Sequence, residues 1–428
     1  MSVLINLLGT PVNEMPPKKG KGKVVEELPK VPRDLFEIAP LDGRDGVLGV
    51  EALEVSDRVR EALAEQVEQR IGLAIASGEL DLDLKDCGLS EIPDALFGLQ
   101  WLQVLDLSRN YLVPGVFSDL KDLAGLRAIN LSGNLLSLSL PASFGDLPQA
   151  IEEISIDDNN VEALPTEAAN LKALSWFSAR RNLLRELPGQ VLGAWSHLTY
   201  LDLRQNKLVS LPPEIGACSA LLELYLNDNA LVELPLELGR CEKLEVLSVQ
   251  RNQLSTIPIS LGGCISLQTL DLTGNVLMDI PLGMLGRLSS LRHLFLGTNK
   301  LQSLPSDVGQ CLSLEQLSAP SNQLKVLPDE IGNLSKLIEI NCGNNPLVTL
   351  PPGVVGWTSM QSGIFRNCKL KALPAGVEAA WKAALLLDVR AKGKKDTCKA
   401  VDTIKSELKF TRIVGVIWSK PKPAKKGK

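Results

Sequence analysis

Eight cysteines are the residues of this chain best suited to do chemistry, because a thiolate can bind a metal ion, form a disulfide or act as a nucleophile. Four of them, Cys218, Cys241, Cys264 and Cys311, are spaced by 23, 23 and 47 residues. A shared period can bring such thiols together in space, where they could bind a metal. The elements that carry them decide whether this chemistry is available.

Other catalytic chemistry has little support in the sequence. The two histidines, His197 and His293, are far apart, and no G-x-x-x-x-G-K-[ST] segment occurs, which argues against a nucleotide-hydrolysing loop of that type. After position 375 the chain has no room for an independent catalytic domain. We therefore expect a protein that is not an enzyme, with no catalytic residue, no cofactor and no bound metal.

An asparagine recurs at steps of 23 to 25 residues, and two cysteines, Cys87 and Cys368, extend the series by one step at each end. A period of this length is typical of a stacked repeat array. Counting the two cysteines, the series predicts thirteen repeats. The asparagines are Asn110, Asn134, Asn159, Asn182, Asn206, Asn229, Asn252, Asn275, Asn299, Asn322 and Asn345.

Each asparagine lies in a frame of the form L-x-x-L-x-L-x-x-N-x-L, as in Leu198, Leu201, Leu203, Asn206 and Leu208. The fourth and sixth positions alternate with polar residues, which predicts a short strand with one apolar face. Stacked repeats would join these strands into a parallel sheet over one continuous core. A buried asparagine needs partners for its amide, so the series predicts a hydrogen-bonded ladder.

A second series follows the asparagines by five residues and pairs leucine or isoleucine with proline, as in Leu211-Pro212. Proline suits a tight outer wall because it has no N–H to donate. Later glycines are expected to supply the bend before the next strand. The second and third repeats, with Val113-Pro114 and Leu140-Pro141, depart from this spacing and should be locally irregular. The bend glycines are Gly216, Gly239, Gly262, Gly286, Gly309 and Gly332.

The frame accounts for seven of the eight cysteines as small buried residues at repeat positions. The periodic four precede the first frame leucine by three residues, where other repeats carry Leu288 and Leu334. Cys342 fills the sixth frame position. A thiol–metal site among the periodic four stays a minor alternative.

The ends of the array should be covered by helices, because a solenoid needs capped ends. Residues 1–50 are expected to be a disordered tail, 51–78 a capping helix, 79–375 the repeats, 376–419 a helical cap and 420–428 a lysine-rich tail. The first helix should run from Ser56 to Ser77 and end at Gly78. We expect further helices at Val377–Val389 and Thr397–Leu408, and a strand or apolar segment at Ile413–Trp418.

Strand side chains that do not enter the core must point onto the concave face, where a partner would bind. Trp176, Tyr200 and Tyr225 lie on successive strands there and should form a nearly continuous patch. Aromatic residues and arginine are enriched at binding hot spots. The candidate partner-binding residues are Trp176, Arg180, Arg181, Tyr200, Arg204, Tyr225, Arg251, His293 and Phe295.

A purely structural interpretation of the charged residues is the alternative. Asp157, Asp158, Asp202 and Asp228 interleave with the arginines, and such pairs can form solvated ladders that contribute little. We favour pairing for each individual arginine or aspartate. For the aromatic residues we favour a partner surface, because exposed Trp and Tyr bring no evident benefit to the fold.

The frame resembles the leucine-rich repeats of the Ras-group class, over roughly residues 79 to 375. That class includes plant intracellular Ras-group-related proteins and a scaffold that joins a small GTPase to a phosphatase. The resemblance implies an α/β leucine-rich repeat solenoid, a horseshoe with a concave parallel sheet, about 13 repeats and helical caps at both ends. Gly415-Val416-Ile417-Trp418 is a loose echo of the GVYW motif of the plant group. The basic-Val/Ile-x-Phe/Trp motif for phosphatase docking is not visible in the N-terminal segment.

Composition and compartment complete these expectations. A net charge of −5 predicts no general affinity for nucleic acid or membranes. The terminal repeats lack the closely spaced cysteines usual in extracellular members, which favours the cytoplasm. We expect a non-catalytic scaffold that binds a protein partner, with a small GTPase or signalling protein implied by the resemblance. The alternative is a cytoskeletal or nucleic-acid-associated protein attached through its lysine-rich tails.

Overall fold

The structure is a computed structural model that describes residues 57–381 and 386–389. Ser56, the helix expected at Thr397–Leu408, the segment Ile413–Trp418 and both tails lie outside the described residues. Cys398 lies outside them as well.

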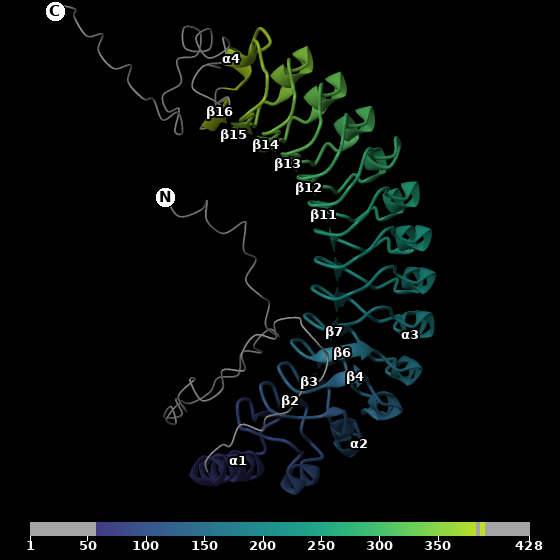
Figure 1. Cartoon of the computed structure of the whole chain (residues 1–428), viewed down its shortest axis with the longest axis vertical. Coiled ribbons are helices and arrows are strands. Elements are labelled where there is room, and N and C mark those ends of the chain that lie inside the picture. Colours follow the sequence, from purple (N-terminus) through teal and green to yellow (C-terminus); the bar gives the residue numbers. More distant parts are fainter. Residues whose placement is uncertain (1–56, 382–385, 390–428) are drawn as a thin grey trace, which may run out of the picture. The chain divides into compact units, whose positions relative to one another are not determined.

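One parallel sheet runs through the whole repeat array, as the frame predicts. Its fourteen strands are hydrogen-bonded in sequence order and line the inner side of the coils (Figure 1). The thirteen predicted repeats each contribute one strand, and the fourteenth comes from the next segment. The strands are β1 Asp81–Asp83, β2 Val104–Asp106, β3 Ala128–Asn130, β5 Glu153–Ser155, β7 Trp176–Ser178, β8 Tyr200–Asp202, β9 Glu223–Tyr225, β10 Val246–Ser248, β11 Thr269–Asp271, β12 His293–Phe295, β13 Gln316–Ser318, β14 Glu339–Asn341, β15 Ser362–Ile364 and β16 Leu386–Asp388.

Short helices line the outer side of the coils, and most of them start directly after the proline of the second series. The proline takes an extended conformation, for example φ −71° and ψ 149° at Pro212, and the chain then closes one 3₁₀ turn. The 3₁₀ helices are Asp94–Gly98, Pro114–Val116, Ala142–Asp146, Thr166–Asn170, Pro213–Ala217, Leu236–Arg240, Ile259–Gly263, Leu285–Arg287, Ser306–Gln310, Asp329–Asn333 and Pro352–Gly356. The α-helices here are α2 Phe117–Leu120, α3 Gly189–Ala194 and α4 Val377–Ala380.

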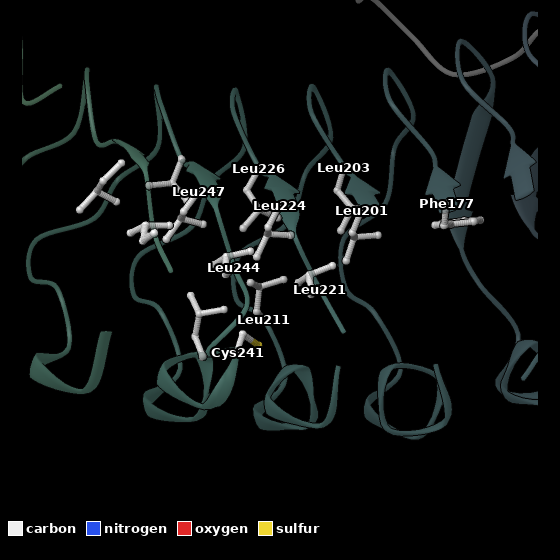
Figure 2. Close-up of a cluster of buried hydrophobic side chains, with 14 of the residues drawn as sticks. Phe177, Leu201, Leu203, Leu211, Leu221, Leu224, Leu226, Cys241, Leu244 and Leu247 are labelled. Carbon is white, nitrogen blue, oxygen red and sulfur yellow. The ribbon is translucent and has the colours of Figure 1, made fainter. Parts of the chain in front are cut away.

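The core lies between these two layers and is built from the frame leucines. Leu201, Leu224 and Leu247 occupy the same position of successive strands, are in register and are fully buried (Figure 2). Burial of each such side chain contributes on the order of 2 kcal/mol. Because each coil covers the apolar face of its neighbour, the core is continuous along the array.

The asparagine ladder is confirmed. The Asn206 carbonyl oxygen accepts the Leu184 N–H of the preceding repeat at 3.0 Å. Its amide group donates to the Ala179 carbonyl at 2.8 Å and to the Leu203 carbonyl at 3.0 Å. Asn252 and Asn345 repeat this arrangement in their own coils. The ladder therefore joins each coil to the one before it.

The residue before each asparagine or its cysteine substitute has a positive φ, which the sequence frame did not predict. At eleven of these thirteen positions the residue is not glycine, and φ lies between 50° and 58°. The left-handed conformation costs such residues about 1–2 kcal/mol. The positions are Asp86, Arg109, Gly133, Asp158, Arg181, Gln205, Asp228, Arg251, Gly274, Thr298, Ser321, Asn344 and Asn367.

The six bend glycines lie in the outer turns before the next strand, as predicted, but the reason for glycine there is different. None of Gly216, Gly239, Gly262, Gly286, Gly309 and Gly332 has a positive φ. They lie in the outer helices, where the next coil packs closely. A Cβ atom on Gly239 would stand 2.0 Å from the Ser260 carbonyl oxygen. Glycine is required there for close approach between coils.

The periodic cysteines form part of a column of buried hydrogen-bond donors. Each thiol of this set contacts a backbone carbonyl of the preceding coil, as Cys218 does with Leu192 at 3.3 Å. In the same column the Trp195 and Trp357 indole N–H groups donate to the Ala168 and Ile331 carbonyls at 3.0 and 2.8 Å. Burial raises the pKa of the Cys218 thiol to about 12. All seven cysteines of the described residues are buried and free.

The N-terminal end of the array is covered by α1, Asp57–Ser77, where a helix was predicted. Val67, Ile71 and Ala74 are buried, and the Arg70 guanidinium donates to the Asp83 carbonyl at 2.8 Å. Gly78 ends the helix with φ 65°, and its N–H donates to the Ala74 carbonyl.

The helix predicted at Val377–Val389 is right only at its start. Of the described residues in this range, Val377–Ala380 form α4, whereas β16 is a strand that extends the sheet by pairing with β15. Trp381 follows Trp357 by one repeat length, and its indole N–H donates to the Val354 carbonyl at 3.0 Å. This segment is a further coil of the array, whose asparagine frame is lost.

The second and third repeats are irregular, as predicted. In the second repeat the 3₁₀ turn Pro114–Val116 continues directly into α2. In the third, β4 Ser137–Ser139 pairs with β6 Asn160–Ala163 in a separate two-stranded sheet, with a register shift after Leu138. Leu140 follows Asn134 by six residues instead of the usual five, so the third repeat has one additional residue before its proline.

Candidate protein-interaction surface

Three neighbouring strands hold the predicted aromatic residues at the centre of the concave face. Trp176 on β7 is in register with Tyr200 on β8 and Glu223 on β9. Tyr225 lies two residues after Glu223 and is in register with Asp202. We call Trp176, Tyr200 and Tyr225 the aromatic patch. Its position follows from the strands, whose alternate residues face away from the core.

The rings of the aromatic patch contact one another. Trp176 and Tyr200 are stacked, with 5.0 Å between ring centroids and 8° between ring planes. Tyr200 and Tyr225 are 5.6 Å apart at 49°. Such aromatic pairs contribute about 0.5–1.5 kcal/mol beyond area burial. All three side chains stay partly exposed, so the structure brings together a preformed apolar surface that solvent reaches.

Arg204 completes one side of the aromatic patch. Its guanidinium lies 4.9 Å from the centre of the Tyr225 ring and forms an ion pair with the carboxylate of Asp202. Asp202 is 2% exposed and also accepts the Arg204 backbone N–H at 3.0 Å. The arginine is therefore held in place by a buried partner two residues away. The sequence suggested pairing across the sheet, whereas this pair lies within one chain segment.

Both tyrosine hydroxyls of the patch have acidic neighbours. Tyr225 donates to the Glu223 carboxylate at 2.7 Å, and Tyr200 lies 3.4 Å from that of Asp202. Burial, together with these carboxylates, raises the pKa of both phenols far above the usual value. The tyrosines therefore remain neutral hydrogen-bond donors at physiological pH.

Asp157 is a mostly buried carboxylate at the edge of the patch. It accepts the Ser178 hydroxyl at 2.5 Å and the Arg180 backbone N–H at 2.7 Å. Burial raises its pKa to about 6, against the lowering effect of these hydrogen bonds, and Asp202 adds to the increase. Asp157 can therefore change its protonation near neutral pH.

Two further candidate arginines form ion pairs with aspartates of the preceding repeat. Arg181 lies 3.2 Å from Asp158, and Arg251 lies 3.1 Å from Asp228. These pairs are well exposed, so each contributes roughly 0–1 kcal/mol. The structural interpretation of these charges therefore holds for both arginines.

Arg180 differs from them. Its guanidinium lies 3.4 Å from the Gln205 side-chain oxygen, and it forms no ion pair with any residue that the structure describes.

His293 and Phe295 are not part of the aromatic patch. They lie on β12, which is separated from β9 by β10 and β11. Their rings are stacked 6.4 Å apart, and the His293 Nδ1 is 3.2 Å from the Thr269 hydroxyl. Burial lowers the pKa of His293, so the ring is neutral at physiological pH. These two residues form a separate, smaller aromatic pair.

Sequence reasoning missed a second structural series on the concave face. At the fifth frame position several repeats carry aspartate or asparagine, whose side chain accepts the N–H two residues later. Examples are Asp106 with Ser108, Asn130 with Ser132 and Asp271 with Thr273, at 2.8 to 3.0 Å. Their recurrence at one frame position is the signal that could have found them. Asp202 belongs to this series and is thereby structural.

An open hollow of about 380 Å³ lies beside the starts of the central strands. Glu152, Ala173, Ser175 and His197 line it, and Ser175 directly precedes Trp176. His197 is exposed, with its Nδ1 3.2 Å from the Lys172 carbonyl oxygen. The arrangement shows an open depression next to the aromatic patch, with the Glu152 and His197 side chains among its lining residues.

The described residues include no cluster of three or more His, Cys, Asp or Glu side chains that could hold a metal ion. Among the same residues, no helix is both long enough and apolar enough to cross a bilayer.

Repeats of this geometry define a known class of protein. The chain matches the leucine-rich repeat family at residues 81–136, 196–254, 219–277 and 265–324. A solved leucine-rich repeat protein of Leptospira interrogans is 30% identical to it, with a TM-score of 0.56, and the match covers 79% of this chain and 96% of that one. The chain belongs to the leucine-rich repeat family.

Other similarities cover parts of larger proteins. Mouse leucine-rich repeat serine/threonine-protein kinase 1 is 29% identical over 144 residues, which is 32% of this chain and 7% of the kinase. The matches cover between 7% and 36% of the length of the curated relatives. The repeats of FLRT2, solved in a complex with latrophilin 3 and Unc5D, share the fold at 22% identity and a TM-score of 0.56, covering 66% of this chain and 89% of that one.

Proposed function

We propose that this chain is a non-catalytic scaffold that holds a protein partner on the aromatic patch of its concave face. Leucine-rich repeat proteins generally mediate protein–protein interaction, and the fold is typically non-catalytic. The observation that carries the proposal is the stacked, partly exposed Trp176–Tyr200 pair on two adjacent strands. The FLRT2 array, which was solved with protein partners, supports the same use of the fold.

The aromatic patch has the properties of a binding hot spot. Tryptophan, tyrosine and arginine dominate such sites, and each central residue contributes about 2 kcal/mol or more when truncated. Here the rings are fixed by mutual stacking and by the Arg204–Asp202 pair, so little side-chain entropy remains to be lost on binding. A partner would therefore meet a surface that is already ordered.

The finer proposal concerns setting and partner class. We place the scaffold in the cytoplasm, in small-GTPase-linked signalling, because its repeat frame resembles the Ras-group class. A purified small GTPase, loaded in turn with GDP and with a non-hydrolysable GTP analogue, tests this directly. Binding that prefers one nucleotide state and is lost in Trp176→Ala would support it, and equal absence of binding in both states would contradict it.

The general proposal is tested by affinity capture with mass spectrometry. Wild type is compared with a triple variant, Trp176→Ala, Tyr200→Ala and Tyr225→Ala. A matched control removes the other concave aromatic pair, through His293→Ala and Phe295→Ala. We expect proteins captured by wild type and by the control to be lost from the triple variant, with a decrease in affinity of at least about 30-fold. Far-ultraviolet circular dichroism verifies that all three are folded.

The competing function uses the lysine-rich tails, where five of the last nine residues are lysine. A chain lacking residues 1–50 and 420–428 separates the two. Capture that survives this truncation and fails in the triple variant supports the concave scaffold. Capture that survives in the triple variant and fails on truncation would instead assign a salt-sensitive, tail-mediated attachment.

A further inference from the structure

The aromatic patch has an acidic border on the side where the strands begin. In the five central repeats, the two concave positions at the strand start carry Glu152, Glu153, Glu223 and Glu245, with no lysine or arginine among them. Glu223 continues the column of Trp176 and Tyr200 in register. We call Glu152, Glu223 and Glu245 the acidic rim. One member of the rim, Glu152, also lines the open hollow beside the strand starts.

Two carboxylates of the acidic rim form no ion pair with any described residue. Glu223 accepts the neutral Tyr225 hydroxyl at 2.7 Å, and Glu245 accepts the Gln268 amide at 2.9 Å. Glu152 pairs with Arg127 of the preceding repeat. The negative charge of the rim is therefore only partly compensated by the chain itself.

The opposite side of the patch is close to neutral. At the strand ends of the same repeats, four arginines face four aspartates, and Arg181, Arg204 and Arg251 are each paired with one of them. The side of Tyr225 that faces Arg204 already has a cation over it. A positively charged group of a partner would therefore find unpaired carboxylates at the strand starts, next to the aromatic rings.

We propose that the partner segment seated on the aromatic patch presents a lysine or arginine side chain to the acidic rim. Its alkyl stem would cover the Trp176–Tyr200 stack while its charged end reaches Glu223 or Glu245. A cation over an aromatic face is stabilised by the ring quadrupole, and a neighbouring carboxylate adds direct attraction. This inference rests on the proposed function, because it specifies the partner of the same surface.

A random 12-residue peptide library displayed on phage provides the probe. The library is selected on wild type, and the enrichment of each peptide is compared with its enrichment on the triple aromatic variant. Enriched peptides are then synthesised with a fluorescent label in two forms. One keeps the selected sequence, and in the other each lysine is replaced by the neutral norleucine and each arginine by the neutral citrulline. Fluorescence anisotropy measures their affinity for wild type, Glu223→Gln and Glu245→Gln. Glu339→Gln, in the same column on β14, is the matched control.

We expect the enriched peptides to carry lysine or arginine and to bind Glu223→Gln or Glu245→Gln about five- to tenfold more weakly than wild type. Glu339→Gln should change nothing. The neutral peptide should lose its sensitivity to the rim variants, because a double-mutant cycle isolates the pair.

Two other outcomes are distinguishable. Peptides that need the aromatic patch but bind both rim variants as tightly as wild type would overturn this inference and leave the proposed function intact. Selection of acidic peptides whose binding depends on Arg180 would overturn it in the same way. If no peptide is enriched over the triple variant, the concave-face function fails, and the inference fails with it.

Discussion

Replacing Asn206 with alanine should unfold the centre of the array more readily than almost any other polar substitution. The side chain is 5% exposed, and its carbonyl oxygen is the only hydrogen-bond partner of the Leu184 N–H seen among the described residues. Its amide group donates to the Ala179 carbonyl at 2.8 Å, which the Asn182 amide also contacts at 3.1 Å. The Leu203 carbonyl is its third partner. Alanine would leave the Leu184 N–H without a partner, whereas the Ala179 and Leu203 carbonyls would each keep the amide of a neighbouring asparagine.

The magnitude follows from those three groups. An unpaired Leu184 N–H costs about 1–3 kcal/mol and each of the two lost carbonyl hydrogen bonds about 0.5–1.5 kcal/mol, so Asn206→Ala should lower the free energy of unfolding by roughly 2–6 kcal/mol. Asn206→Cys should lose less than alanine does. In the last predicted repeat the Cys368 thiol takes the asparagine position and contacts the Cys342 carbonyl at 3.2 Å, so one of the three interactions is retained.

Urea denaturation followed by far-ultraviolet circular dichroism measures the free energy, and hydrogen exchange of the Leu184 amide measures the local effect. Asn333→Ala, an exposed asparagine in an outer helix, is the matched control and should change stability by less than about 0.5 kcal/mol. A loss below about 1 kcal/mol in Asn206→Ala, or equal losses for alanine and cysteine, would refute the ladder as a main source of stability.

Three further predictions concern single sites. Gly239→Ala should lower the free energy of unfolding by about 1–3 kcal/mol in urea titrations, because its Cβ would meet the Ser260 carbonyl oxygen at 2.0 Å. An unchanged midpoint would show that the outer helices can separate at little cost. Thr298→Gly should raise the thermal midpoint, with a gain of up to about 1 kcal/mol, because a β-branched residue there has φ 55°; a lower midpoint would contradict the strain argument. Asp157 has a pKa raised to about 6 from 3.8, so the folded state holds its proton more tightly than the unfolded state. Its contribution should therefore favour folding at about pH 4 and decline as pH rises to 6, and wild type should gain on the order of 2–3 kcal/mol relative to Asp157→Asn as the pH falls through this range; parallel pH profiles for the two would contradict it.

The fold was predictable because its determinants are local and periodic. The leucines and asparagines of each frame specify the core, the register and the ladder. The same pattern recurs in successive repeats, so an assignment made in one repeat can be checked in the next. The glycines show where this reasoning fails. Gly239 looks like a bend residue in the sequence. Glycine is required there because the Ser260 carbonyl of the next coil leaves no room for a Cβ atom. A local sequence pattern gives no information on this contact between coils.

The last strand was missed for a related reason. The predicted helix at Val377–Val389 rested on apolar spacing alone, whereas β16 is formed because β15 offers an edge for pairing. The recurrence of Trp357 as Trp381, both donating to the preceding coil, was the available signal. A repeat can thus persist after its asparagine is lost.

The candidate site was predictable in position but not in detail. Register brings Trp176 and Tyr200 together, and the sequence indicates register directly. The placement of Arg204 over Tyr225 depends on rotamers held by Asp202, which periodicity does not encode. His293 and Phe295 lie on one strand farther along the array, as the repeat spacing indicates, and β10 and β11 separate them from β9.

The strict register of the strands has a consequence for how this surface can change over time. From β7 to β10 one buried apolar residue faces another across each junction, in the order Phe177, Leu201, Leu224 and Leu247, and the aromatic patch lies at the positions between the core residues. Because each coil contacts only its neighbours, a substitution at one of these intervening positions leaves the other coils unaffected. Recognition and folding are therefore encoded by separate residues in this part of the chain. A lineage could exchange one partner for another by a few point substitutions at Trp176, Tyr200 and Tyr225, at a cost of about 0.5–1.5 kcal/mol for each ring contact that is lost.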